Sequence, residues 1–312
     1  MIEIFLQTLP FFLLIGFGFG AGKTGFFSPD ATAALTKFVF YFALSALLFQ
    51  FSARLEFSDI LDWNFIAAYL TASLAIYLVA TIVAFARKLP IEEAAIEAQV
   101  AVIGNVGFLG IPMLAILLGD RAVLSVMVIL SVDLIVFSSL VVILVHGSRD
   151  GRMSFAILKS IGKGLLANPM IVSIVLGLSV SALDISVPKP VGQFLGILGA
   201  AATPGALFAI GASLATKSAE RVAVAGWLSF CKLILHPAAV AFTALYVFDV
   251  DPYAAGVMIT ASALPVAGNV YILAAHFGIA PTRVSASILI STAISIFTVS
   301  AVVAWVTPFM PM

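Results

Sequence analysis

The sequence is poor in charged residues and in cysteine. Only 10% of its 312 residues are charged, whereas a water-soluble domain carries about 25%. The 15 basic and 15 acidic residues balance, and a zero net charge argues against nucleic acid as a partner. Cys231 is the only cysteine, so no disulfide can form within the chain. The sequence is therefore neither a disulfide-stapled domain nor a typical nucleic-acid-binding domain.

The motifs of intramembrane enzymes are also missing. Aspartyl proteases of the membrane need two aspartates, and Asp133 is the only one deep in an apolar run. The zinc motif His-Glu-x-x-His is absent, and the chain has only His146, His236 and His276. No Gly-x-Ser-x-Gly nucleophile motif occurs. The sequence therefore predicts no enzyme activity, no metal site and no cofactor.

Long apolar runs are abundant instead. Hydrophobic residues make up 62% of the chain, and the mean hydropathy is +1.20. An apolar helix of about 17 to 25 residues can cross a hydrocarbon core of about 30 Å. Ten spans are predicted, at residues 4–22, 32–52, 64–86, 93–118, 122–146, 165–183, 190–214, 222–247, 253–277 and 284–307. The longest connection, from His146 to Gly164, leaves no room for a soluble catalytic domain. We therefore expect an all-α protein embedded in the lipid bilayer.

The basic residues predict the orientation of the chain, because cytoplasmic loops are enriched in lysine and arginine. Three basic residues, Arg54, Arg121 and Lys189, belong to the even-numbered loops between the ten spans. Eleven belong to the odd-numbered loops and adjoining helix ends: Lys23, Lys37, Arg87, Lys88, Arg149, Arg152, Lys159, Lys163, Lys217, Arg221 and Arg283. This bias predicts cytoplasmic odd loops, with both termini on the outer, periplasmic side of a cell inner membrane.

The second half of the chain resembles the first half at a shift of 159 residues. Pro10 then falls on Pro169, and "SALLFQFSARL" at 45–55 falls on "PGALFAIGASL" at 204–214. Each half has five predicted spans, so the second half must enter the membrane with the opposite orientation. Two inverted repeats of this kind are typical of secondary transporters. The expected division is a first repeat at 1–146, a cytoplasmic linker at 147–164 and a second repeat at 165–312.

Helix-breaking residues interrupt the fourth and the ninth of the predicted spans, which are mates in the two halves. The fourth contains "GNVGFLGIP" at 104–112, and the ninth contains "ALPVAGNVY" at 263–271. Proline removes a backbone donor and clashes with the preceding turn, and glycine permits an open backbone. At the shift of 159 residues Asn105 falls on Leu264 rather than on Asn269, so the two breaks do not align perfectly. We expect two discontinuous helices that cross near the middle of the membrane.

The two breaks predict a binding site for a small anion. Free backbone groups at membrane depth are tolerated only where they line a cavity or are covered by protein. Half-helix N-termini offer N–H groups and a partial positive charge, to which Asn105 and Asn269 add amide groups. The predicted substrate-binding residues are Gly104, Asn105, Gly107, Gly110, Pro112, Pro265, Gly268 and Asn269. The alternative is a packing kink, in which small residues allow close contact between helices.

Several segments resemble one family of transporters. "GNVGFLGIP" resembles the fourth-span motif of the auxin efflux carrier family, whose bacterial members include proteins described as malate and malonate permeases. "LLANPMIVSIVLGL" (165–178), "ATPGALFAIGASL" (202–214) and "KLILHP" (232–237) resemble its sixth, seventh and eighth spans. "KFVFYFALSALLFQF" (37–51) resembles its second span, which commonly has a proline where this chain has Ser45.

The resemblance implies a fold and a mechanism. It implies ten spans, with a scaffold domain of spans 1, 2, 6 and 7 that forms a homodimer, and a transport domain of spans 3–5 and 8–10. It also implies elevator-like movement of the transport domain. Asn105, Pro112, Pro265 and Asn269 would line the site by this resemblance. The expected function is secondary active transport of small organic anions such as mono- or dicarboxylates.

Charged residues at membrane depth are costly and usually functional or paired. Asp133 lies near the middle of the fifth predicted span, and Lys232 near the middle of the eighth. They could form a structural charge pair, take part in proton coupling, or, for Lys232, contact the substrate. His236 shares a helix face with Lys232 and titrates near physiological pH when unperturbed, although Pro237 beside it also suits a plain kink.

The remaining interpretations concern the entrance, the coupling ion and an alternative function. Glu92, Glu93 and Glu97 begin the fourth span and suggest a solvated cytoplasmic entrance. The ninth span contains no acidic residue, which disfavours the sodium coupling of the related bile-acid symporters. An anion channel or a non-transporting receptor on the same scaffold is the alternative function.

Overall fold

The computed structural model describes residues 2–54, 62–150, 155–216 and 222–310. Throughout these residues the regular elements are helices, and the β pairing is confined to one isolated bridge. The expected all-α class is thereby confirmed. Arg152, Lys217 and Arg221, which were counted for the orientation, lie outside the described residues, as do residues 151–154 of the predicted linker.

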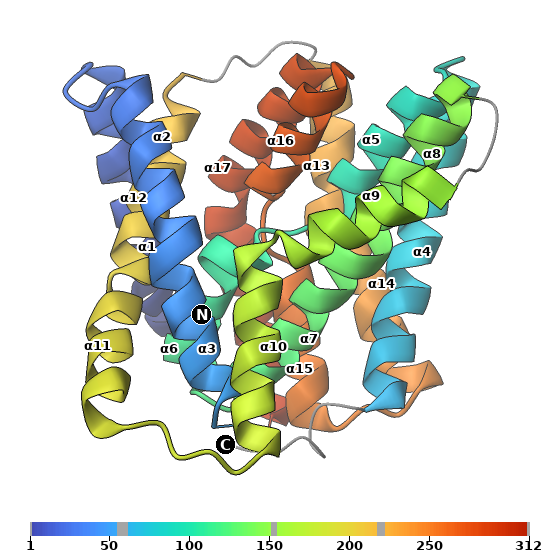
Figure 1. Ribbon diagram of the computed structural model, residues 1–312. Coiled ribbons are helices and arrows are strands. Elements are labelled where there is room, and N and C mark those ends of the chain that lie inside the picture. Colours follow the sequence, from blue (N-terminus) through green and yellow to red (C-terminus); the bar gives the residue numbers. More distant parts are fainter. Residues whose placement is uncertain (1, 55–61, 151–154, 217–221, 311–312) are drawn as a thin grey trace.

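The helices follow one another in a chain of long, short and interrupted elements (Figure 1). The α-helices are α1 (Ile2–Lys23), α2 (Pro29–Phe38), α3 (Leu44–Ser52), α4 (Trp63–Ala86), α5 (Ile91–Val102), α6 (Ile111–Leu118), α7 (Ala122–Val132), α8 (Ser138–Asp150), α9 (Phe155–Leu166), α10 (Pro169–Ala182), α11 (Lys189–Ala200), α12 (Ala202–Leu214), α13 (Val222–Phe230), α14 (His236–Phe242), α15 (Pro252–Ser262), α16 (Gly268–Phe277) and α17 (Pro281–Val306). Within the described residues, five π-helical segments adjoin them: η1 (Val39–Ala43), η3 (Val106–Gly110), η4 (Asp133–Phe137), η5 (Cys231–Leu235) and η6 (Thr243–Val247). A 3₁₀ turn, η7 (Thr307–Phe309), follows α17.

Seven helical stretches within the described residues are long and apolar enough to cross a membrane. They are Phe5–Lys23, Pro29–Ser52, Trp63–Ala86, Ala122–Arg149, Lys189–Leu214, Val222–Val247 and Pro281–Phe309. Two shorter apolar stretches, Val106–Leu118 and Pro169–Ala182, accompany them. The predicted spans 93–118 and 253–277 are each divided into two shorter helices. The count of ten spans and the inverted repeat stay predictions.

Polar side chains mark the starts of several helices. Asp62 accepts hydrogen bonds from the backbone N–H groups of Asn64 (2.9 Å) and Phe65 (3.1 Å) at the start of α4. Asn168 and Asp251 cap α10 and α15 in the same way, and a proline follows each of them. Capping satisfies N–H groups that have no partner inside the helix. These sequence signals fix where the apolar helices begin.

The helices form two groups by their packing. In the first group, α1 packs on α12, α12 on α2, and α3 on both α10 and α11. In the second group, α4 packs on α5 and α14, α15 on α7 and α14, and α13 on α17. Figure 1 shows α1, α2, α11 and α12 on the left and α4, α5 and α8 on the right. The groups meet where α1 contacts α17 and α6, and where η3 contacts α12.

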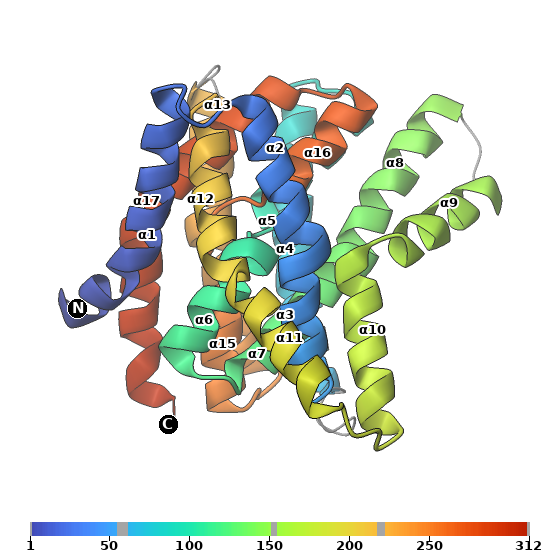
Figure 2. The same ribbon diagram turned by 60° about the vertical axis from the view of Figure 1, so that its left-hand side comes forward.

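Glycines allow α1 and α12 to approach closely, and Figure 2 shows the two helices side by side. A methyl group on Gly18 would collide with the backbone carbonyl of Phe208, and one on Gly211 would collide with the backbone of Ile15 and Phe19. Small residues on both partners are a common basis of helix packing in membranes. This contact therefore depends on the absence of side chains at these two positions.

The Gly18→Ala variant is expected to lower the melting temperature of the purified protein. The added methyl group meets backbone that cannot turn aside, and overpacking of this kind costs about 1–3 kcal/mol. Gly16→Ala on the same helix is the matched control, because no atom lies within 4 Å of its Cβ position. Alanine is the better helix former by roughly 0.5–1 kcal/mol, so Gly16→Ala should leave the melting temperature unchanged or raise it. Equal melting temperatures for the two variants would contradict the close packing of α1 and α12.

Candidate functional site

The two interrupted helices cross and pair through their unwound backbone. The Asn105 N–H donates to the carbonyl oxygen of Pro265 (2.8 Å), and the Ala267 N–H donates to that of Ile103 (3.1 Å). Between these bonds, Gly104 and Val266 form an antiparallel bridge. Each unwound segment thus satisfies backbone groups of the other, as buried backbone requires. The two breaks that the sequence predicted meet and pair in the structure, and their crossing near the middle of the membrane stays a prediction.

Four helix ends meet at this crossing. α5 ends at Val102 and α15 ends at Ser262, whereas η3 begins at Val106 and α16 at Gly268. The ends of α5 and α15 carry partial negative charge, and the starts of η3 and α16 carry partial positive charge. The start of η3 is stabilised by the carbonyl of Asn105, which accepts hydrogen bonds from the N–H groups of Leu109 (3.1 Å) and Gly110 (2.9 Å). The crossing therefore offers positive ends for an anion and negative ends for a cation.

The predicted binding residues differ in exposure. Six of them are buried: Gly104, Asn105, Gly107, Gly110, Pro112 and Pro265. Gly268 and Asn269, on the first turn of α16, are exposed. Asn105 is 7% exposed, so the two asparagines have unequal surroundings although the sequence predicted the same role for both. Their part in substrate binding stays a prediction.

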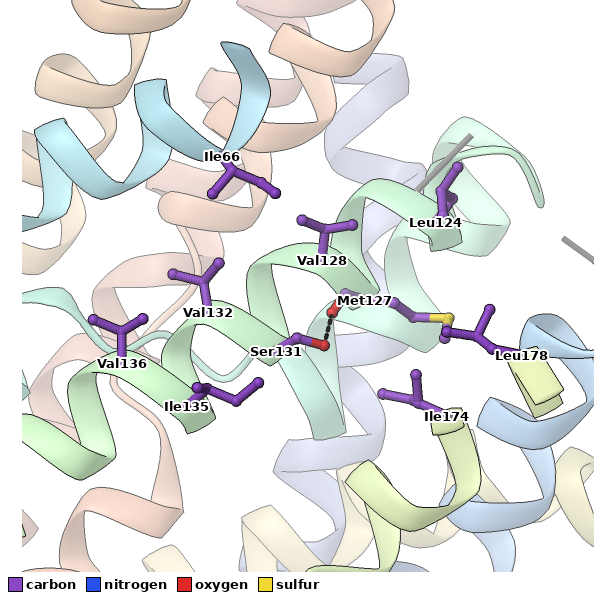
Figure 3. A pocket seen from close by; sticks show the side chains of 10 residues that line it. All are labelled: Ile66, Leu124, Met127, Val128, Ser131, Val132, Ile135, Val136, Ile174 and Leu178. Carbon is purple, nitrogen blue, oxygen red and sulfur yellow. Dashed lines mark hydrogen bonds between the residues drawn. The ribbon is translucent and has the colours of Figure 1, made fainter. Parts of the chain in front are cut away.

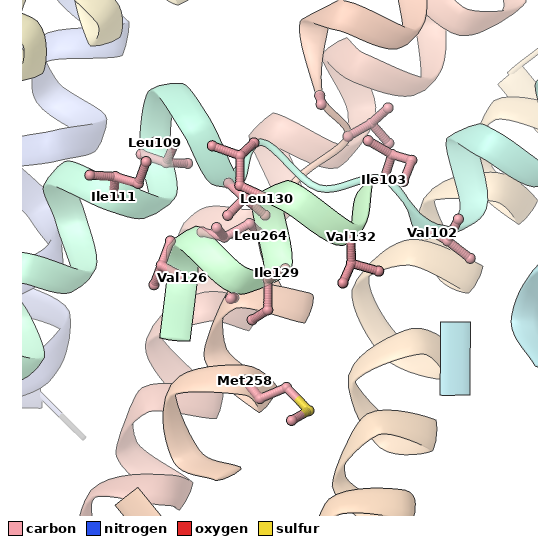
Figure 4. Packing of buried hydrophobic residues seen from close by; sticks show 14 of the residues in the cluster. Val102, Ile103, Leu109, Ile111, Val126, Ile129, Leu130, Val132, Met258 and Leu264 are labelled. Carbon is pink, nitrogen blue, oxygen red and sulfur yellow. The ribbon is translucent and has the colours of Figure 1, made fainter. Parts of the chain in front are cut away.

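Two glycines of the first break serve close packing. A methyl group on Gly107 would lie 2.8 Å from Cε of Met170, and one on Gly110 would lie 2.8 Å from Cδ1 of Leu264. Figure 4 shows Leu264 among buried apolar side chains such as Leu130 beside this break. Met170 belongs to α10, so the first break lies against the first helix group. Packing therefore accounts for these glycines, whether or not a ligand also approaches them.

A ring contact joins the same break to the first helix group. Phe108 in η3 stacks on Phe40 in η1, with ring centroids 6.1 Å apart and planes 7° apart. Stacked aromatic pairs at such distances are stabilising. The broken helix thus sits at the boundary between the two groups.

A buried polar cluster lies within the second helix group. Asp133, Lys232 and His236, which the sequence singled out, are all buried. The Tyr69 hydroxyl donates to Oδ1 of Asp133 (2.8 Å), and Nε2 of His236 is 2.9 Å from the hydroxyl of Ser73. The structure therefore brings the three residues together and adds two partners from α4. Sequence reasoning missed Tyr69 and Ser73, because they look like ordinary helix residues in an apolar span.

The structure does not join Asp133 and Lys232 in a direct ion pair. The ammonium of Lys232 donates to the carbonyl of Ser262 and lies 3.3 Å from Nδ1 of His236. Oδ2 of Asp133 has no hydrogen-bond partner among the described residues. The two charges still interact electrostatically.

The expectation of a solvated entrance was wrong for Glu97, whereas the side chains of Glu92 and Glu93 are 28% and 31% exposed. Glu97 is 1% exposed and pairs with Arg283 (2.6 Å) and with Arg87. Arg283 also pairs with Glu93 (3.0 Å), and Arg149 pairs with Glu92 (3.1 Å). These ion pairs connect α5 to α17 through Arg283 and to α8 through Arg149. The positive charges of its two arginine partners allow the carboxylate of Glu97 to remain buried. From the sequence, these arginines had served only to predict the orientation of the chain in the membrane, and their pairing with the glutamates was missed.

An apolar cavity of about 260 Å³ lies between α4, α7, η4 and α10. Figure 3 shows Ile66, Val128, Val132 and Ile174 pointing into it. The single polar residue of its lining, Ser131, donates its hydroxyl to the carbonyl of Met127 within its own helix (2.8 Å). Such a lining offers no donor to a carboxylate, so this cavity is not the predicted anion site. Among the described residues no group of three His, Cys, Asp or Glu side chains could hold a metal ion.

The chain has apolar helices of membrane-spanning length, and two interrupted helices pair with each other among them. These features define a multi-pass membrane protein of the transporter class. Residues 3–303 match the model of a family described as membrane transport protein. The chain belongs to this family, which includes the auxin efflux carriers, so the expected resemblance is confirmed and the chain is not an enzyme. A protein of Rhizobium meliloti (strain 1021) named "Putative malonate transporter" is 27% identical over 303 residues, covering 96% of this chain and 95% of that protein.

Proposed function

We propose that this protein is a secondary active transporter that carries small organic anions, such as mono- or dicarboxylates, by alternating access. The observation that supports this most is the crossing of the two broken helices. It gathers two positive helix ends and the amide of Asn105 in one place. Helix N-termini bind anions through free N–H groups and the helix dipole. The name of the relative from Rhizobium meliloti supports a malonate-like substrate.

The helix ends support the inverted repeat of residues 1–146 and 165–312. At the shift of 159 residues, Val102 at the end of α5 falls on Ala261, one residue before the end of α15. The second half-helix begins farther on, because the unwound segment is Ile103–Asn105 in the first break and Ala263–Ala267 in the second. The start of α16 lies three residues beyond the position that matches the start of η3, which is part of the five-residue displacement of the asparagine.

The packing supports an elevator-like movement. The first helix group corresponds to the scaffold spans 1, 2, 6 and 7, and the second to the transport spans 3–5 and 8–10. Both crossing helices belong to the second group, and the first break faces the scaffold at Phe40 and Met170. A site at that boundary changes its exposure when one group slides along the other. The homodimer through the scaffold rests on the family resemblance.

Calorimetric titration of the purified protein with malonate tests the proposed substrate class. Dimethyl malonate is the matched control, because it keeps the carbon skeleton and removes both charges. Binding of malonate and loss of binding for the ester are expected. An ester that binds as tightly as the acid rules out the anion site.

The Asp133→Asn variant is expected to change the pH dependence of transport if the proton is the coupling ion. Asparagine keeps an oxygen that accepts from Tyr69 but cannot take up a proton at ordinary pH. Tyr69 donates to this carboxylate and Lys232 interacts with it electrostatically, and His236 and Ser73 complete the same cluster through Lys232. The measurement is initial uptake between pH 5 and pH 8 in proteoliposomes. An unaltered pH profile in a well-folded variant would remove Asp133 from coupling, and a fall in melting temperature alone would assign it a structural role.

A further inference from the structure

The ammonium group of Lys232 lies at the helix crossing itself. Lys232 is fully buried in η5 and donates a hydrogen bond to the carbonyl of Ser262, the last residue of α15. A methyl group built on Gly104 would lie 3.2 Å from Nζ of Lys232 and 3.4 Å from the carbonyl oxygen of Ala261. The ammonium is therefore wedged between the end of α15 and the unwound backbone of the first break.

Negative charge surrounds this ammonium. The carbonyl ends of α5 and α15 carry the negative end of the helix dipole, and the last carbonyl of α15, that of Ser262, accepts the hydrogen bond from Lys232. Asp133 adds a buried carboxylate that interacts with Lys232 electrostatically, and its Oδ2 has no hydrogen-bond partner among the described residues. These neighbours favour a positive charge beside them, and no acidic side chain forms a direct ion pair with Lys232 among the described residues.

We propose that the Lys232 side chain is a tethered cation that takes the place of a dissolved co-ion at the crossing. The proposal rests on the proposed function and adds a positioning role for one residue. The ammonium neutralises the carbonyl ends of α5 and α15, and this holds the two breaks in register. The positive ends of η3 and α16 are left free for the substrate anion. Anion binding then needs no sodium or other small cation from solution.

The test uses two variants that differ in the space they leave. Lys232→Ala removes Cγ, Cδ, Cε and Nζ, which are the heavy atoms of n-propylammonium. Lys232→Met fills most of the same space with an uncharged side chain. Both variants and the unaltered protein are titrated with malonate in choline chloride, with and without added n-propylammonium or sodium. Melting temperatures are recorded in each buffer as a readout that does not depend on the anion.

The unaltered protein should bind malonate equally well in choline and in sodium. Both variants should lose affinity by about tenfold or more in choline, the loss expected for one hydrogen bond to a charged group. n-Propylammonium or sodium should restore affinity and melting temperature in Lys232→Ala and have no effect on Lys232→Met. If Lys232→Ala yields no folded protein in choline, purification in n-propylammonium should recover it.

Three results would overturn the proposal: a sodium requirement in the unaltered protein, full affinity in Lys232→Met, or failure of both cations to restore Lys232→Ala. Absence of malonate binding in the unaltered protein in every buffer counts against the proposed substrate instead. The melting temperatures of the two variants still decide the role of Lys232 in that case.

Discussion

Replacing Asn105 with leucine is expected to weaken malonate binding about 10- to 150-fold. Leucine is close to asparagine in volume but cannot hydrogen-bond, and a hydrogen bond to a charged group contributes roughly 1.5–3 kcal/mol. Asn105 is buried at the crossing, so water cannot replace the lost amide. Its backbone bonds to Pro265, Leu109 and Gly110 do not depend on the side chain. The variant should therefore fold, and calorimetric titration measures the loss.

Asn269→Leu is the companion variant and should lose less affinity than Asn105→Leu. Asn269 is exposed, so water competes with its hydrogen bonds, and a loss near the lower end of the same range is expected. The two losses need not add, because both amides would serve one ligand. The packing interpretation predicts the opposite pattern, with normal affinity and lowered melting temperatures. Unchanged affinity in both stable variants would refute the assignment of the site.

Replacing Glu97 with alanine is expected to destabilise the protein by about 3–5 kcal/mol, the cost of removing one partner from a buried ion pair. Glu97 is 1% exposed, and its loss leaves the buried Arg283 with only the carboxylate of Glu93. The contact between α5 and α17 weakens as a result. The melting temperature of the purified variant measures the effect.

Glu92→Ala provides the matched control on the same helix. Glu92 pairs with Arg149, whose side chain is 45% exposed, and an exposed ion pair contributes about 0–1 kcal/mol. Its melting temperature should stay close to that of the unaltered protein. Similar melting temperatures for Glu97→Ala and Glu92→Ala would show that the buried network does not hold α5 in place.

The helix breaks could be predicted from the sequence because proline and glycine act locally. "GNVGFLGIP" and "ALPVAGNVY" interrupt a helix through their own proline and glycine residues, whatever the rest of the chain does. They also lie in spans that correspond between the two halves. The capping residues Asp62 and Asp251 act over the next two or three residues and are readable in the same way. The all-α class followed from the length and apolarity of the runs.

The contacts between distant segments could not be read in this way. The register that pairs Gly104 with Val266 depends on how two helices meet in space. The partnership of Arg283 with Glu97 joins residues 186 positions apart, and no local pattern indicates it. The exposure of Asn269 and the burial of Asn105 also depend on neighbouring helices rather than on the shared Gly-Asn-Val. The π-helical segments that contain Asp133 and Lys232 have no sequence signature of comparable strength.

Counterflow in proteoliposomes tests the central claim most directly. Vesicles that contain the purified protein are loaded with unlabelled malonate and diluted into a trace of labelled malonate, with empty vesicles and the Asn105→Leu variant in parallel. A carrier with one alternating site predicts saturable uptake and a transient accumulation of label above equilibrium, both reduced in the variant. Label that only equilibrates, without saturation, would show an anion channel, and binding without any flux would show a receptor; either result would contradict secondary transport by this protein.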